Sequence, residues 1–329
     1  MKVFTEFFLI LALGCSLGCN NVKDLQPIDP EVVPPTAVEA LKRRYPSADD
    51  ILMKTLVLNK LWHTSFKSNA SQYETQLSAT AIVGPVIRKA DGDFSFYKSL
   101  TDQLSIKGGE FSDLRIVEGT TKNIGPIIYY DALMNYRLNG KSYQLHYSSV
   151  GESDQIRLIS NFSTYYVLQP EDIPQQIVKF FSDNSLSLVD NDIYVFVDPA
   201  GLKTYRAYLK ALWAPNPAHY AICFDKDFNL TWIGQNSDGS AVVPTVNSEI
   251  GRAELLAKSS KYIIDFKPIV GAFQTSFKGL QSVRYLFTKT NFETDGGSSK
   301  SIVESWQILT NPASEPVLSE EYMGYITRN

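Results

Sequence analysis

Two short patterns match parts of a serine nucleophile site. Ser95 and Lys98 have the Ser-x-x-Lys spacing, and Ser182 begins a Ser-Asp-Asn sequence. The third element of that set, Lys-Thr-Gly, is absent, because the Lys-Thr pair at Lys203 is followed by Tyr205. No Gly-x-Ser-x-Gly elbow, phosphate-cradling loop or dinucleotide fingerprint is present. We therefore regard both matches as chance, and expect no catalytic residues and a protein that is not an enzyme.

Three histidines and one acidic loop are the candidates for holding a metal ion. His63, His146 and His219 each lie in a predicted strand beside an aromatic residue, without a His-x-Glu or His-Glu-x-x-His pattern. The loop Asp225–Asn229 starts like a calcium loop, but Leu230 stands where the sixth position needs Gly. We expect a hairpin there, half-exposed sheet positions for the histidines, and no metal or other cofactor.

Pairs of adjacent tyrosines are the remaining sign of a binding surface. Successive side chains of a strand point to opposite faces, so Tyr129-Tyr130 and Tyr165-Tyr166 each place one ring on either face. We select Tyr130 and Tyr166 as the outward members, with Trp213, as candidate ligand- or partner-binding residues. The period does not decide which member of a pair points outward, and the alternative is that all are ordinary strand residues.

The N-terminus has the pattern of an export signal that ends in a cysteine. The apolar run Phe7–Leu13 is too short to cross a bilayer and matches the central region of a signal peptide. A Gly-Cys pair follows twice, at Cys15 and Cys19, and resembles the lipobox of bacterial lipoproteins, whose cysteine carries diacylglycerol. We favour Cys19 as the lipidation site, because residues 1–18 then fall within the usual signal-peptide length of about 15–30. Cys15 is the alternative.

Composition sets further limits on the mature chain. The 329 residues include 44% hydrophobic and 12% aromatic residues, a length that suggests about two domains. A net charge of -4 argues against a nucleic-acid partner, which favours a basic face. Cys223 is the one cysteine beyond the N-terminal pair, so no internal disulfide is expected. Four prolines predict an extended tether over residues 19–35.

Hydrophobic periodicity predicts helices that each precede a run of antiparallel strands. Thr36 and Glu39 have the spacing of a capping box, and Tyr45 before Pro46 ends that first helix. Three more helices are predicted to start near Phe96, Asp172 and Ser248. The predicted strands are 61–66, 73–83, 114–117, 127–138, 142–148, 155–159, 193–197, 204–212, 219–224, 230–233, 262–266, 269–277, 282–288, 302–309 and 322–326.

Together these elements predict an α+β fold of tandem units, each with one helix packed on an antiparallel β-meander sheet. We expect an N-terminal domain over residues 36–165 and a C-terminal domain over 166–329, with two possible units in each. Trp62 should be buried on the same strand face as Phe66, and Asn139-Gly140 should form a hairpin turn.

Two of these units resemble the PepSY-like domains of Bacteroidetes, which are also described as β-lactamase-inhibitor-like. The segment 37–49 has the aromatic-Pro-x-Ala ending of their first helix, and Trp62 lies in a following strand. Segment 173–177 is similar to their helix start, and segment 224–230 to their final hairpin, although Phe228 stands where Gly is usual. The resemblance covers under half of the chain. It implies a secreted or periplasmic binding or inhibitory module without catalytic residues.

The sequence thus predicts a non-catalytic, lipid-anchored binding protein of the outer membrane, facing the periplasm or the cell surface. One helix on one face of a sheet leaves the other face open to a partner. The expected partners are the membrane, through the anchor, and a small-molecule, glycan or protein ligand. An outer-membrane transporter is a further partner if the protein is the accessory capture component of a nutrient uptake system. The alternative is an inhibitor of a secreted or periplasmic enzyme.

Overall fold

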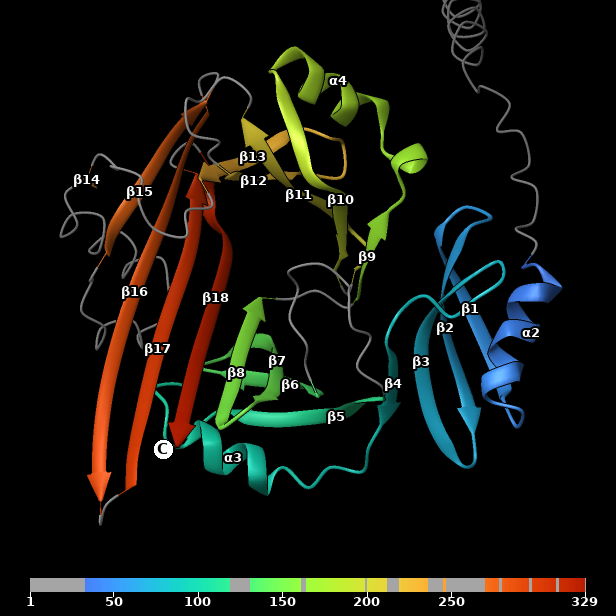
Figure 1. The fold of residues 1–329 in the computed structure, drawn as a ribbon, viewed down its shortest axis with the longest axis horizontal. Helices are drawn as coiled ribbons and strands as arrows, with labels where there is room; N and C mark the ends of the chain where they lie inside the picture. The colour runs from blue at the N-terminus through green and yellow to red at the C-terminus, as the bar shows by residue number, and fades with distance from the viewer. Residues whose placement is uncertain are drawn as a thin grey trace, which may run out of the picture.

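Two antiparallel sheets make up most of the computed structural model (Figure 1), which describes residues 33–118, 131–160, 164–198, 200–211, 219–235, 245–246, 270–277, 280–295, 298–311 and 314–328. The larger sheet has 13 strands, in the order β1-β2-β3-β4-β5-β6-β7-β8-β18-β17-β16-β15-β14. Its strands are β1 (Asp49–Val57), β2 (Leu61–Ser68), β3 (Ser71–Ser78), β4 (Val86–Lys89), β5 (Glu110–Glu118), β6 (Ala132–Leu138), β7 (Lys141–Val150), β8 (Ser153–Ser160), β14 (Thr245–Val246), β15 (Val270–Phe277), β16 (Leu280–Asp295), β17 (Ser298–Asn311) and β18 (Ser314–Arg328). The smaller sheet has five strands, in the order β13-β12-β11-β10-β9. They are β9 (Thr164–Leu168), β10 (Leu186–Val197), β11 (Lys203–Ala211), β12 (His219–Phe224) and β13 (Leu230–Gln235).

The larger sheet joins the two halves of the chain. Strands β1 to β8 pair in chain order, and β8 then pairs with β18, with Gln155 opposite Tyr325 and Leu158 opposite Tyr322. In Figure 1 the two ends of this sheet, β1–β3 and β15–β18, lie on opposite sides of the molecule, with the five-stranded sheet between them. The last strand, β18, therefore joins the strands of the N-terminal half of the chain to those of the C-terminal half.

Within the described residues, three α-helices each cover part of a sheet. They are α2 (Pro35–Arg44), α3 (Ser95–Thr101) and α4 (Gln175–Asp183), the last preceded by the 3-10 turn η1 (Pro170–Asp172). Leu41 of α2 packs with Phe66 and Leu77 of β2 and β3. Leu100 of α3 belongs to the core formed with β5–β8 and β16–β18. Ile177 of α4 is buried in the core of the five-stranded sheet.

The predicted fold class is wrong, because the structure is mostly β rather than α+β with one helix per unit. Strands β8 and β18, which were expected in separate units, pair with each other, and the unpredicted strand β4 links β3 to β5. One continuous sheet therefore replaces the tandem units. The fourth predicted helix, from Ser248, lies outside the described residues. The predicted domain boundary between residues 165 and 166 falls inside β9. Periodicity identifies a strand, but it does not identify the strand's partner.

Helix α2 begins differently from the prediction. It starts at Pro35, without a side-chain cap, so the expected capping box of Thr36 and Glu39 is not formed. Proline suits the first helical turn because its missing N–H would have no partner there. The Thr36 hydroxyl instead donates to the carbonyl of Ala79, at 2.5 Å. The helix ends at Arg44, and Tyr45 is its C-cap, in agreement with the predicted end at the Tyr45-Pro46 pair.

The apolar face of α3 differs from the prediction at one position. Leu100 and Leu104 are buried as expected, but Phe96 is 47% exposed and Tyr97 is buried in its place. The ring centroid of Phe96 lies 5.4 Å from that of Tyr147, so the exposed ring still covers the sheet.

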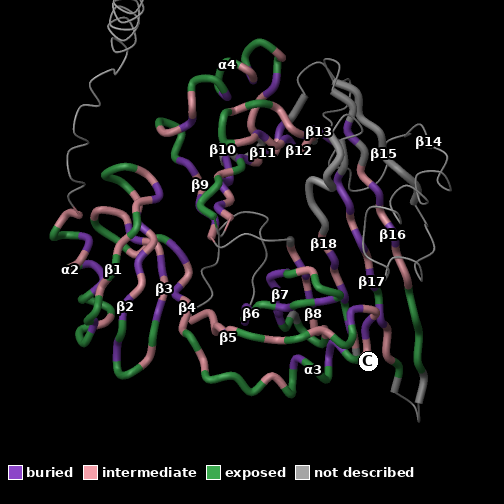
Figure 2. Tube along the Cα trace, turned by 180° about the vertical axis from the view of Figure 1, so that it is seen from behind, coloured by how far each residue is buried: buried purple, intermediate pink, exposed green. Residues whose placement is uncertain are grey.

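Several strand and turn predictions are confirmed. Trp62, Thr64 and Phe66 are buried on one face of β2, an alternation that can be followed in Figure 2. The hairpin between β6 and β7 turns at Asn139 and Gly140, with φ of 51° and 80°. A two-residue turn of this kind needs positive φ at both positions, which explains the Asn-Gly pair.

The hairpin between β12 and β13 is also confirmed, and it forms despite Phe228. This residue has φ of 64°, in the left-handed region that usually favours Gly and costs other residues about 1–2 kcal/mol. The Asp225 carboxylate accepts the N–H groups of Asp227 and Asn229, both at 2.9 Å. Burial alone would raise the pKa of Asp225, but hydrogen bonds from Asn229 and Asp227 lower it below its ordinary value. The ring centroid of Phe228 lies 5.1 Å from that of Tyr205, and this aromatic contact offsets the cost of the backbone conformation.

The five-stranded sheet contacts both ends of the larger one. At one end Leu56, at a bulge in β1, inserts its side chain into the core of the five-stranded sheet. The Leu56 carbonyl accepts the Tyr166 hydroxyl at 3.2 Å and the Lys203 ammonium at 3.1 Å. At the other end the Ile233 N–H donates to the Ser282 hydroxyl at 3.2 Å. These contacts fix the smaller sheet against the larger one, and a cavity lies beside the Leu56 contact.

The predicted membrane attachment falls on residues that the structure does not describe. Cys15, Cys19 and most of the tether precede residue 33, where the description begins. Among the described helices, none combines the length and the apolar character that a membrane span requires.

Candidate ligand-binding cleft

A cavity of about 450 Å³ lies between the two sheets, and we call it the cleft. The larger sheet lines it with residues of β1, β2, β3, β5, β6 and β7, and the smaller sheet with residues of β9, β10 and β11. Its lining residues are Lys54, Thr55, Leu56, His63, Glu74, Asp113, Arg115, Asn135, Tyr143, Gln144, Thr164, Val197, Gly201 and Lys203. Five of them are acidic or basic residues, namely Lys54, Glu74, Asp113, Arg115 and Lys203. The cleft is therefore polar, although the two sheets that form it meet through apolar contacts.

A bulge in β5 places two of these charges. The β5–β6 register shifts between Ser112 and Arg115, and Asp113 within the bulge has φ of 54°. Such a conformation costs a non-Gly residue of order 1–3 kcal/mol, and bulges often redirect side chains beside functional sites. The Asp113 carboxylate lies 3.2 Å from the Arg115 Nε and 3.9 Å from the Lys89 ammonium. The bulge thus brings an aspartate and an arginine to the same wall.

His63 and Glu74 form a second polar pair in the cleft. The His63 Nε2 lies 3.7 Å from a carboxylate oxygen of Glu74 on the neighbouring strand β3. Burial lowers the pKa of His63 below its ordinary value; Glu74 opposes this shift, and the positive charges of Lys54 and Arg115 add to it. The imidazole is therefore neutral at physiological pH.

Gln144 is oriented by a buried histidine. The prediction that His146 is half-exposed is wrong: residues 143–148 of β7 are all buried, because this central strand is covered on both faces. Burial holds the pKa of His146 well below its ordinary value, and the charges of Arg157 and Arg115 act in the same direction. The His146 Nε2 lies 2.7 Å from the Gln144 Oε1, so this nitrogen donates to the amide oxygen. The NH₂ end of Gln144 is then the end that can donate to a bound molecule.

Two lysines face the cleft from opposite sheets. Lys203 of β11 is half-buried; its ammonium donates to the Leu56 carbonyl and lies 5.7 Å from the centre of the Tyr166 ring. Burial lowers the pKa of Lys203, and the positive charge of Lys54 lowers it further. Within the described part of the chain, neither Lys54 nor Lys203 forms an ion pair with a carboxylate.

A second cavity, of about 460 Å³, lies farther along β9 and is more apolar. Tyr165, Tyr166 and Val167 of β9 line it, together with Leu61 and Pro85. A third cavity, of about 40 Å³, shares lining residues with both of the others. The Gln76 side-chain amide donates to the Tyr165 carbonyl. This hydrogen bond joins β3 to β9, and both of its residues line the second and third cavities.

Of the three aromatic residues predicted for a binding face, only Tyr166 lies among the described residues, and it is buried. Tyr166 was expected to point outward, but it is 3% exposed and packs in the core of the five-stranded sheet. Burial raises the pKa of its hydroxyl, and the nearby Tyr205 adds to this shift. Strand β9 is covered on both faces, so Tyr165 is buried as well and period 2 selects no outward member of this pair. Tyr130 and Trp213 lie outside the described residues, so their predicted role stays a prediction.

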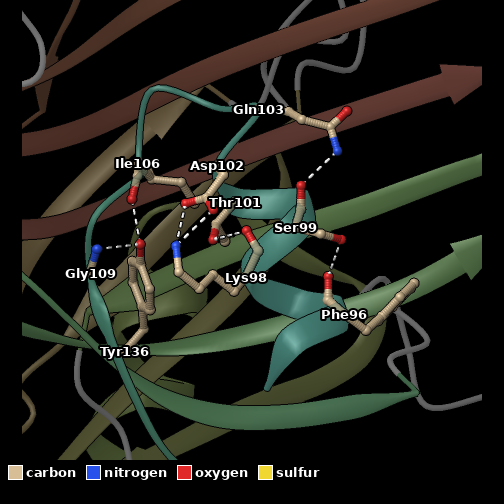
Figure 3. Close-up of polar contacts among 9 residues, drawn as sticks. All are labelled: Phe96, Lys98, Ser99, Thr101, Asp102, Gln103, Ile106, Gly109 and Tyr136. Atoms are coloured by element: carbon tan, nitrogen blue, oxygen red, sulfur yellow. Dashed lines mark hydrogen bonds and ion pairs between the residues drawn. The ribbon is translucent and has the colours of Figure 1, made fainter. Parts of the chain in front are cut away.

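The serine motif matches lie on the surfaces of two separate helices. Ser95 is exposed on α3, and the Lys98 ammonium pairs with Asp102 one turn later, at 2.7 Å (Figure 3). Ser182 is exposed on α4, at the far end of the molecule from α3 in Figure 1. The Thr101 and Ser99 hydroxyls of α3 donate to backbone carbonyls of the same helix. Neither match brings a serine and a lysine together at the cleft.

Sequence reasoning singled out His63 but missed the residues that surround it. Lys54, Arg115, Gln144 and Lys203 come from four strands, and no local pattern links them. Among the described residues, no group of three His, Cys, Asp or Glu side chains is placed to hold a metal ion. The distinguishing feature of the cleft is its cationic side chains, which are brought together by the strand pairing within the larger sheet and by the docking of the smaller sheet against it.

Comparisons with known proteins do not assign a family to this arrangement. The resemblance to PepSY-like domains stays a prediction that rests on its short motifs. No family model matches the sequence, and none of the curated proteins or solved structures compared with the chain matches it.

Proposed function

We propose that this protein is a non-catalytic binding protein that holds a small polar ligand in the cleft. The observation that carries this proposal is the cavity of about 450 Å³ between the two sheets. Its volume lies within the range of about 300–1,000 Å³ that is typical of small-molecule sites, and such sites favour the junctions between packed units. The proposal makes the cleft, rather than an open sheet face, the binding surface.

The walls of the cleft are held in place before any ligand arrives. Leu56 ties β1 to the five-stranded sheet by its side chain and by the two hydrogen bonds to its carbonyl. Lys60 reinforces this junction through its ion pair with Asp172, at 2.7 Å. A preformed site loses less conformational entropy on binding than one that must be assembled, which favours affinity for a small ligand.

The proposed location follows from the N-terminal pattern. A lipid on Cys19 would anchor the chain to the outer membrane, and the proline-rich tether would extend the folded part away from the lipid surface. A binding protein in that position, on the periplasmic or the external side, suits the capture step of a nutrient uptake system. This proposal includes an outer-membrane transporter as the receiving partner.

A thermal-shift screen of the purified full chain against sugars, amino acids and organic acids tests the binding function. A ligand that binds only the folded protein raises its melting temperature. Asn135, exposed on β6, lines the cleft, so Asn135→Trp should fill the cavity and abolish the shift. Arg137→Trp is the matched control, because Arg137 is exposed two residues along the same strand but is not a lining residue.

Stabilisation of the wild type and the control but not of Asn135→Trp would support the cleft as the site. Equal stabilisation of all three proteins would reject it. A protein partner captured equally well by the wild type and by Asn135→Trp would instead favour the alternative function, an inhibitor that binds through another surface.

A further inference from the structure

The charges in the cleft are not balanced by the protein itself. Three cationic side chains, Lys54, Arg115 and Lys203, and two carboxylates, Glu74 and Asp113, line the cavity. The Asp113 carboxylate is shared between Arg115 and a lysine outside the cavity, and the Glu74 carboxylate faces a histidine. Neither carboxylate forms an ion pair with Lys54 or Lys203 in the described part of the chain. Two ammonium groups are thus left for another partner.

Lys203 in particular occupies a position that is unfavourable for a cation without an anionic partner. It is half-buried, its hydrogen bond is to a neutral carbonyl, and Lys54 is near enough to lower its pKa. A partly buried charge is costly unless it is paired, and a nearby like charge adds to that cost. An anion in the cleft would reduce both the cost of burying the Lys203 ammonium and its repulsion by Lys54.

The other groups around the lysines are also suited to an anion. Gln144 has its amide oxygen engaged by His146, so it offers hydrogen-bond donors to the cavity. Arg115 adds further N–H donors from β5. A negatively charged group therefore meets donors from both sheets, and a cavity with walls of low dielectric concentrates their field.

We propose that the cleft binds a small acidic ligand, whose carboxylate, sulfate or phosphate group is held by Lys54 of the larger sheet and Lys203 of the smaller one, with Arg115 and Gln144 also donating from the larger sheet. This inference rests on the proposed function, and it narrows the ligand from any polar molecule to an anionic one. The ligand's neutral portion would occupy the rest of the cavity, beside Asn135 and Thr164.

Titration calorimetry of the purified full chain, at constant ionic strength, tests this proposal with three probes. Inorganic phosphate reports on the anion site alone. D-glucuronate and D-glucose form a matched pair that shares a ring and differs in the carboxylate. Constant ionic strength is needed because salt screens such interactions. We expect saturable binding of phosphate or glucuronate, and weaker or no binding of glucose.

Lysine variants then locate the anion. Hydrogen bonds to charged groups imply that Lys54→Met and Lys203→Met each weaken binding by about tenfold to a hundredfold. Lys203→Arg keeps the charge and should retain binding. Lys179→Met and Lys226→Met are the controls, because these exposed lysines of α4 and the β12–β13 hairpin lie outside the cleft and should leave the affinity unchanged.

Several results would overturn the acidic-ligand proposal. They are the absence of saturable binding of both anions, glucose binding as tight as that of glucuronate, and affinity that neither Lys54→Met nor Lys203→Met reduces. Lys54 is exposed on β1, so its variant keeps the test decisive even if Lys203→Met loses stability. Neutral ligands that bind the wild type but not Asn135→Trp would leave the proposed function standing while refuting its anionic character. Binding of phosphate alone would indicate a phosphate ester, and binding of glucuronate alone a carboxylic acid.

Discussion

The Leu56 carbonyl gives a quantitative test of how the two sheets are joined. It accepts one hydrogen bond from the Tyr166 hydroxyl and one from the Lys203 ammonium, at 3.2 and 3.1 Å. Tyr166→Phe removes the first and should cost about 1 kcal/mol of unfolding free energy; Lys203→Met removes the second, a charged bond worth about 1.5–3 kcal/mol. Phe keeps the aromatic ring, so the contact between Lys203 and that ring survives in the first variant.

The two losses should not add. In each single variant the carbonyl keeps one side-chain donor, but in the double variant it loses both at a buried position, where an unsatisfied group costs about 1–3 kcal/mol. We therefore expect a coupling free energy of at least about 1 kcal/mol. The repulsion between Lys203 and Lys54 is removed in both backgrounds, so it cancels from the cycle. Urea unfolding measures all four proteins, with an unchanged m-value as the check that only stability differs. Additivity within about 0.3–0.5 kcal/mol would refute the role assigned to this carbonyl.

Three other predictions concern the anchor, the core and the dependence of stability on pH. Metabolic labelling with a lipid precursor should tag the wild-type protein and Cys15→Ala but not Cys19→Ala; the reverse pattern would move the lipidation site to Cys15. Trp62→Ala should lower the unfolding free energy by about 3–5 kcal/mol, because the ring is fully buried, and a melting temperature equal to the wild type's would contradict the assignment. His146 and His63 have lowered pKa values, so they take up protons on unfolding, and stability should fall as the pH drops below about 6.5. Denaturant titrations should show a slope of up to about 1.4 kcal/mol per pH unit for each histidine, and His146→Gln should reduce that slope; an equal slope in this variant would refute the assignment.

Local features of the fold were predictable where one physical rule dominated. The period-2 pattern placed Trp62 and Phe66 on a buried face, and the Asn139-Gly140 pair fixed a turn that needs two positive φ values. The rule failed at Tyr166, because period 2 selects a buried face only when the opposite face meets water. The capping-box prediction failed at Thr36, because its hydroxyl donates to the carbonyl of Ala79 and the helix begins at Pro35 instead.

The candidate site was less predictable than the strands. Its lysines come from β1 and β11, and its arginine from the bulge of β5. None of these residues belongs to a recognisable motif in its own segment. That Lys54, Arg115 and Lys203 line one cavity becomes evident only once the two sheets are docked. In the bulge, Asp113 adopts a left-handed backbone conformation, and no turn motif in that segment of the sequence predicts it. Sequence reasoning could name His63 because histidines are few, not because its neighbours were visible.

The pairing of β8 with β18 sets the order in which the protein can be assembled. Gln155 and Tyr325, whose side chains are hydrogen-bonded across this pair, are 170 residues apart in the chain. If the chain emerges from an export channel with its N-terminus first, β8 remains an edge strand until β18 has emerged. Until then the outer N–H and C=O groups of β8 are unpaired. Edges of this kind promote aggregation, and pairing over such a distance is slow. Under the proposed export, β8 would thus need protection until β18 has emerged, and removal of residues 321–327 would leave that edge permanently exposed.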